Sequence, residues 1–292
     1  MAAAEINGIT IEYESHGDER AAETMLLVMG LGGQLVAWSM DWVNRFVEAG
    51  FRVIRFDNRD IGLSTTFDDF VVRRRHLVRA ALAPKRAPAP YQLGDMAEDA
   101  AALLDHLGVE RAHVVGVSMG GMISQELAIR RPGQVVSLAS IMSSAGDRRH
   151  GLPKLSVLRT VLTSRSPNPD DALATSMRIF RAISGPLFDE DEVRQLAKES
   201  LARHFDTVGP ARQILAILTS PDRTPALRRL DLPTLVVHGL ADPLVTPSGG
   251  VATARAIPGS RLLMFPDMGH DLPRERWDEI IPAIIDNTRR AV

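Results

Sequence analysis

The residues best suited to nucleophilic chemistry lie in the stretch Gly116-Val117-Ser118-Met119-Gly120. The apolar run before Ser118 predicts a short buried strand, and the helical pattern after it ends near Arg130. A serine at a sharp turn from a strand into a helix presents its hydroxyl where it can attack a carbonyl carbon. The turn leaves little room for side chains, which favours glycine at 116 and 120. The simpler alternative is a glycine-rich turn without chemistry.

A serine hydroxyl is a weak nucleophile near neutral pH, so it needs a base within hydrogen-bond reach and a group that orients the base. We expect His270 to be the base, because it follows a predicted strand in a short glycine-flanked loop near the end of the chain. The expected orienting acid is Asp242, which follows the strand before the one that leads to His270. Ser118, Asp242 and His270 are therefore the predicted catalytic residues.

Other histidines and carboxylates are weaker candidates for these two roles. His238 lies inside a predicted strand, where a hydrogen-bonded core imidazole is more common than a catalytic base. Asp267 and Asp271 are closer to His270 in sequence, but a short loop does not easily bring an adjacent carboxylate back onto the imidazole. Asp57 follows a neighbouring predicted strand and stays an alternative acid.

Acyl transfer also requires two hydrogen-bond donors for the oxyanion that forms on the attacked carbonyl. The backbone amide of Met119 lies at a predicted helix N-terminus, where amides point outward. The second donor is expected in the loop 30–33, which follows an apolar strand and whose glycines let the backbone approach a substrate. We expect Leu31 to supply it, with Gly30 and Gly32 as alternatives.

The elements that must hold these loops are read from apolar periodicity. Apolar runs predict strands at 25–29, 53–56, 114–117, 135–142, 234–239 and 261–265, of which 25–29 and 114–117 are expected to be buried, with helical patterns between several of them. Residues 5–13 alternate around Asn7-Gly8, which predicts an antiparallel hairpin with a type I′ turn. This alternation predicts an α/β fold with a mainly parallel sheet, helices on both faces and an antiparallel start. Ligands of such sheets bind at the carboxyl ends of the strands.

The strand and helix rhythm stops after the sixth strand. Residues 145–225 show helical patterns with Pro and Gly breaks and no convincing strand, and we name this range the helical insertion. The expected core domain is then formed by residues 1–144 and 226–292. A separate basic segment, 71–86, is more consistent with an exposed loop or short helix than with a nucleic-acid site.

Composition excludes several other classes of function. The 292 residues carry a net charge of −2, which does not favour nucleic acid or an anionic membrane as a partner. Cysteine is absent, so a thiol nucleophile and disulfides are excluded. We find no metal-ligand spacing, no dinucleotide-binding glycine motif, no signal peptide and no apolar run long enough to span a bilayer. We therefore expect a cofactor-free cytoplasmic protein with a small-molecule partner.

The serine turn, the segment 57–64, Asp242 and Met268-Gly269-His270 resemble the α/β-hydrolase superfamily. Within it the chain looks most like the bacterial esterases that include aclacinomycin methylesterase, through segments 27–30, 58–60 and 269–273. The resemblance implies the order nucleophile, acid, base found here and a helical cap over the active site. The chain departs from the common pattern by carrying Met29 where a histidine often precedes the glycine of the loop 30–33. The motif therefore does not identify which residue supports this loop by hydrogen bonding.

These observations predict a carboxylic ester hydrolase that works through an acyl-enzyme. The expected substrates are small to medium, largely apolar esters, with methyl esters among them. A cofactor-free perhydrolase with the same three residues is the alternative within this chemistry. A ligand receptor that keeps the scaffold without catalysis is the alternative from another class.

Overall fold

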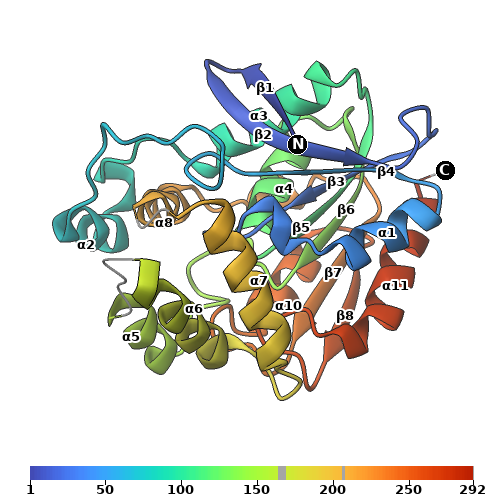
Figure 1. The fold of residues 1–292 in the computed structure, drawn as a ribbon. Coiled ribbons are helices and arrows are strands. Elements are labelled where there is room, and N and C mark those ends of the chain that lie inside the picture. Colours follow the sequence, from blue (N-terminus) through green and yellow to red (C-terminus); the bar gives the residue numbers. More distant parts are fainter. Residues whose placement is uncertain (164–168, 206–207, 292) are drawn as a thin grey trace.

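The computed structural model describes residues 1–163, 169–205 and 208–291, and it contains one eight-stranded sheet (Figure 1). The strand order across the sheet is β1-β2-β4-β3-β5-β6-β7-β8. Strands β1 and β2 pair antiparallel, β2 and β4 pair antiparallel, and all other neighbours are parallel. The bounds are β1 Ala2–Ile6, β2 Ile9–His16, β3 Thr24–Val28, β4 Arg52–Phe56, β5 Ala112–Val117, β6 Val135–Ile141, β7 Thr234–Gly239 and β8 Arg261–Phe265. The predicted α/β class with an antiparallel start is confirmed.

The first hairpin follows from its turn residues. Asn7 has a φ of 50° and Gly8 a φ of 74°, which are the left-handed values that a type I′ turn requires. The register then pairs Ile6 with Ile9 and places Ala4 opposite Ile11. The buried side chains of this hairpin join the core on one face of the sheet.

The sheet is covered on both faces because alternate residues of each parallel strand point to opposite sides. Leu26 and Val28 of β3 pack on the face covered by α3 (Leu93–His106) and α4 (Met119–Arg130). Met25 and Leu27 pack on the face covered by α1 (Met40–Glu48) and α11 (Trp277–Arg289). The remaining helices of the carboxyl-terminal part are α9 Thr224–Leu227, α10 Ser248–Ala256 and the 3-10 helix η3 Arg274–Arg276. The central parallel strands β3 and β5 are therefore held between two apolar layers, whereas β7 and β8 contribute to the layer under α1 and α11.

The helical insertion lies between β6 and β7. It contains α5 Leu155–Thr163, α6 Pro169–Ile183, α7 Glu190–Arg203 and α8 Gly209–Thr219. Helix α6 contacts both α5 and α7, whereas α8 lies beside the segment before α3, close to residues 74–86 (Figure 1). The described residues of this range contain no strand, whereas 164–168 and 206–207 lie outside the described residues. The function of this range as a cap stays a prediction.

The basic segment forms a short helix, α2 (Arg74–Leu82), followed by the 3-10 helix η2 (Pro84–Arg86). Most of its charged side chains are exposed. A further 3-10 helix, η1 (Leu35–Ala37), precedes α1. Within the ranges that the structure describes, no helix has both the length and the apolar character needed to cross a membrane.

Candidate active site

Ser118 lies between the end of β5 and the start of α4, as the sequence predicted. Its backbone has φ 56° and ψ −119°, a conformation that L-residues rarely adopt. Two backbone hydrogen bonds fix it, from the Ser118 amide to the Ile141 carbonyl at 2.8 Å and from the Met122 amide to the Ser118 carbonyl at 3.2 Å. Strain of this kind costs on the order of 1–3 kcal/mol and persists only where the surroundings enforce it. The side chain keeps partial exposure.

The glycines beside Ser118 are required by close packing. A Cβ at Gly116 would overlap the Gly120 carbonyl and the Ser124 hydroxyl, and a Cβ at Gly120 would overlap the carbonyl of Val28. The next glycine, Gly121, has the Ser143 side chain against it. The serine turn is thus packed closely between the end of β3 and the residues at and after the end of β6.

The three residues predicted to act together do meet in space. His270 Nε2 lies 2.8 Å from Ser118 Oγ, and His270 Nδ1 lies 2.8 Å from Asp242 Oδ2. The Asp242 carboxylate is fully buried, and the His270 side chain is 8% exposed. Ser118 and His270 are 152 positions apart in sequence, and Asp242 and His270 are 28 positions apart. They meet because the parallel strands β5, β7 and β8 end at the same edge of the sheet.

Asp242 is held as a carboxylate by its surroundings. Its Oδ1 accepts hydrogen bonds from the amides of Leu244 at 2.8 Å and Val245 at 2.9 Å. Burial by itself would raise the pKa of Asp242, but the imidazoles of His270 and His238 outweigh it and lower the pKa to about 2. The group that faces His270 Nδ1 is therefore ionised at neutral pH, which is the state that orients and stabilises an imidazolium.

The loop of His270 is fixed from the core and from the helical insertion. A Cβ at Gly269 would overlap the backbone of Ser184 and Gly185 at the end of α6. The His270 amide donates to the Ile183 carbonyl at 2.8 Å. Asp271 accepts from the amides of Gly185 at 3.1 Å and Gly269 at 2.8 Å, and burial raises the pKa of its carboxyl. The insertion therefore contacts the loop that carries the base.

The weaker candidates have other partners. His238 is fully buried, and its Nε2 lies 2.7 Å from the Val245 carbonyl oxygen and 3.5 Å from Asp242 Oδ2. Asp57 accepts a hydrogen bond from the amide of Leu35 and forms an ion pair with Arg203 of the insertion. Asp267 forms an ion pair with Arg276. In the part of the chain that the structure describes, neither Asp57 nor Asp267 bonds to His270.

The loop 30–33 lies against Ser118. A Cβ at Gly30 would lie 3.1 Å from Ser118 Cβ, so the backbone passes directly beside the serine. The Gly32 amide is already used, because it donates to the side-chain oxygen of Gln213 at 2.9 Å. Among the described residues, the amides of Leu31 and Met119 have no hydrogen-bond partner. Their predicted role as oxyanion donors is compatible with this arrangement.

Two supporting residues were missed from the sequence. The Asn58 side-chain amide donates to the Met29 carbonyl at 3.0 Å, and Gln213 contacts the loop from α8. Asn58 had a partial signal, since it follows the end of β4 in a segment that resembled the family. The sequence contains no signal for Gln213, because a single glutamine in an amphipathic helix is not part of a motif with a recognisable spacing.

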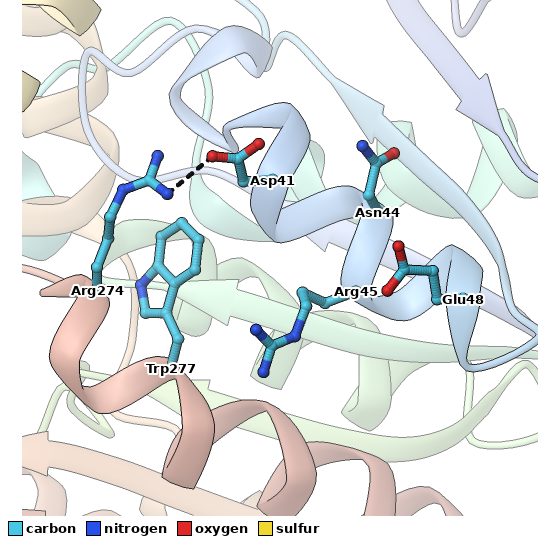
Figure 2. A pocket seen from close by; sticks show the side chains of 6 residues that line it. All are labelled: Asp41, Asn44, Arg45, Glu48, Arg274 and Trp277. Carbon is cyan, nitrogen blue, oxygen red and sulfur yellow. Dashed lines mark hydrogen bonds and ion pairs between the residues drawn. The ribbon is translucent and has the colours of Figure 1, made fainter.

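A separate hollow lies between α1 and the start of α11, two helices that cover one face of the sheet (Figure 2). It encloses about 340 Å³ and is lined by Asp41, Asn44, Arg45, Glu48, Arg274 and Trp277. The dashed line in Figure 2 marks the ion pair of Arg274 with Asp41 at 2.7 Å. None of these six side chains belongs to the loops that carry the three predicted catalytic residues, so the hollow is not part of that site.

Comparison with known proteins agrees with the fold and the motifs. Residues 23–275 match the family described as the alpha/beta hydrolase fold, and the chain belongs to this family. Rhodomycin D methylesterase DnrP of Streptomyces peucetius is 30% identical over 97% of this chain and 96% of that protein. Rhodomycin D methylesterase DauP of Streptomyces sp. strain C5 is 29% identical over the same shares. The predicted resemblance to esterases of the aclacinomycin methylesterase type, and the prediction of a hydrolase, are confirmed.

A solved structure gives the same result for the fold. The enol-lactonase from Burkholderia xenovorans LB400 has a TM-score of 0.76 and 26% sequence identity. The similarity covers 99% of this chain and 100% of that chain, so the sheet and the helical insertion are both included.

Proposed function

We propose that this chain is a serine carboxylesterase that hydrolyses small to medium, largely apolar esters, with methyl esters among them. The observation that carries the proposal is the hydrogen-bonded series from Asp242 through His270 to Ser118, with both distances at 2.8 Å. The relatives named rhodomycin D methylesterase support methyl esters as substrates. The helical insertion is proposed as a cap, since it bonds to the loop of His270.

The first half of the reaction forms the acyl-enzyme. Ser118 Oγ attacks the ester carbonyl carbon while His270 Nε2 takes the hydroxyl proton, and Asp242 stabilises the imidazolium. As the carbonyl oxygen becomes negatively charged, it accepts hydrogen bonds from the backbone amides of Leu31 and Met119. The tetrahedral intermediate then collapses, the carbon–oxygen bond to the alcohol breaks, and His270 returns its proton to the departing alkoxide.

The second half releases the acid. A water molecule attacks the carbonyl of the acyl-Ser118 ester while His270 Nε2 takes its proton. The same two amides donate hydrogen bonds to the second oxyanion. The intermediate then collapses, the bond between the carbonyl carbon and Ser118 Oγ breaks, and His270 returns its proton to Ser118 Oγ. No cofactor enters either half, since every proton moves between substrate, water, Ser118 and His270.

The test is the substitution Ser118→Ala with a panel of p-nitrophenyl esters and methyl esters of bulky acids. We expect kcat to fall by a factor on the order of 10⁴ or more, because only binding and oxyanion stabilisation remain. The matched control is Ser137→Ala, which removes a hydroxyl that bonds to His113 farther back in the sheet. Ester turnover in Ser118→Ala at the wild-type rate would remove the proposal.

A further inference from the structure

The loop 30–33, which we call the oxyanion loop, is held by a side chain that belongs to the helical insertion. Gln213 of α8 is fully buried, and both ends of its amide are used. Its oxygen accepts from the Gly32 amide at 2.9 Å, and its nitrogen donates to the Arg59 carbonyl at 2.9 Å. One side chain thus bridges the loop after β3 and the loop after β4.

The loop needs such a restraint because of its composition. Three of its four residues are glycine, and glycine has the largest choice of backbone conformations. Gly32 adopts a left-handed φ of 67°. Rotation of the peptide between Leu31 and Gly32 would change ψ of Leu31 and φ of Gly32. Because the loop is anchored at both ends, neighbouring dihedral angles would have to compensate, including those of the preceding peptide, which carries the Leu31 amide. A hydrogen bond to the Gly32 amide fixes that peptide.

The partner on the other side of Gln213 is rigid. Arg59 is largely buried and makes two hydrogen bonds with the Asp99 carboxylate, at 2.6 Å and 2.7 Å. Its guanidinium also lies over the Tyr91 ring at 5.0 Å. The Arg59 carbonyl is therefore a fixed acceptor, and the position of the Gln213 amide is set by the core.

Adjacent contacts bring the insertion to the same loop. Pro210 at the start of α8 lies against Gly32, within van der Waals distance of where a Cβ would be. Gln34, just after the loop, donates to the carbonyls of Ser200 and His204 at the end of α7. The loop and the residue that follows it are thus bonded to α8 and α7, and the Met29 carbonyl before the loop accepts from the Asn58 side-chain amide.

From these contacts we infer that Gln213 is a positioning residue: by holding the Gly32 amide, it orients the amide of Leu31 toward the oxyanion. The inference rests on the proposed ester hydrolysis. It also links the insertion to catalysis, since displacement of α8 removes the partner of Gly32 and leaves the oxyanion loop unrestrained. The substrate-binding surface is expected to be little affected by Gln213 itself, because its amide faces two backbone groups.

The experiment compares wild type with Gln213→Met, which keeps the side-chain length and removes both hydrogen bonds. The matched control is Ser220→Ala, which removes the acceptor for the Leu93 amide at the other end of α8 and does not contact the oxyanion loop. Three quantities are measured for each protein: kcat and KM for a p-nitrophenyl ester, the rate of Ser118 labelling by a fluorophosphonate, and the affinity for a trifluoromethyl ketone, which forms an oxyanion adduct.

We expect Gln213→Met to lower kcat, the labelling rate and the trifluoromethyl ketone affinity by about tenfold to a hundredfold, with KM changed less than threefold. Ser220→Ala is expected to leave all of them within about twofold of wild type. If Gln213→Met does not fold, Gln213→Asn, whose amide is withdrawn by one methylene, is expected to give the same split between kcat and KM.

Two results would overturn the inference. One is a folded Gln213 variant with wild-type labelling and ketone affinity. The other is an equal loss of kcat in Ser220→Ala, because this would mean that any loosening of α8 has the same effect. Failure of the proposed function gives a different result, namely wild-type protein that turns over no ester. The labelling rate still compares the variants in that case, since it does not depend on turnover.

Discussion

The serine turn and the helical insertion are held in place by different kinds of contact. Around Ser118 the constraint is steric. Neighbouring atoms leave no space for a Cβ at positions 116 and 120, and apolar layers on both faces of the sheet hold β3 and β5. Polar side chains join the insertion to the core at several points, among them the buried pair Arg212–Asp60 and the pair Arg203–Asp57. The reacting groups therefore lie on the rigid part, and one support of the oxyanion loop lies on the part that polar contacts hold.

This comparison separates two kinds of mutational effect. Changes at the strand ends should reduce catalysis far more than stability. Changes at the polar contacts of the insertion should reduce stability first, and they should affect catalysis only where they remove or displace a contact to the oxyanion loop.

The largest effect is expected for Asp242→Asn. The amide removes the negative charge that holds the imidazole of His270, so kcat should fall by a factor of about 10⁴ while the fold is kept. Steady-state kinetics and circular dichroism on the same sample would check this. A variant with near wild-type kcat would mean that another carboxylate orients His270, and Asp57 would be the first to test.

The next effect is expected for Arg212→Met in α8. Arg212 is 1% exposed and pairs with the fully buried Asp60 carboxylate at 2.8 Å, so its removal leaves a buried charge with less compensation. Breaking such a pair costs about 3–5 kcal/mol. We expect faster hydrogen exchange of the α8 amides and a lower free energy of unfolding in urea.

The control for Arg212→Met is an exposed contact between the same two regions. Glu192 of α7 pairs with Arg274 of η3 at 2.6 Å, and both side chains are more than a third exposed. Glu192→Gln should change the free energy of unfolding by less than about 1 kcal/mol. Equal destabilisation by the two substitutions would contradict the division between buried and exposed contacts.

A smaller effect is expected in the pH dependence of stability. The folded-state pKa of Asp242 is lowered to about 2 from 3.8, so its ionisation stabilises the fold above about pH 4, and this contribution is lost as the pH falls through 2. The free energy of unfolding of wild type should exceed that of Asp242→Asn by about 2 kcal/mol near pH 7. The difference should narrow to about 1 kcal/mol near pH 3. A difference that widens on acidification would contradict this assignment.

Much of the fold could be predicted from local pattern. The buried strands are continuous apolar runs, the Asn7-Gly8 pair specifies its turn, and the glycines beside Ser118 indicate the sharp turn. The meeting of Ser118, Asp242 and His270 followed from one rule, that parallel strands end at one edge of the sheet. Their catalytic roles stay predictions.

The supports of the oxyanion loop could not be predicted in the same way. Gln213 and Asn58 form hydrogen bonds with backbone groups. Because every residue has a backbone carbonyl and nearly every residue has a backbone amide, the sequence does not indicate which of them is the partner. The buried pair Arg212–Asp60 joins residues 152 positions apart, and neither residue type at that spacing indicates a contact. Such contacts depend on where the helical insertion packs, which local periodicity does not determine.

The central claim is that Ser118 forms the acyl-enzyme, and acid quenching within the first turnover tests it most directly. Wild-type protein mixed with a p-nitrophenyl ester, quenched and digested, should show the added mass of the acyl group on the peptide that contains Ser118. The mass should be absent from Ser118→Ala. Acylation of a different residue, or a burst of p-nitrophenol with the peptide of Ser118 unmodified, would contradict the account.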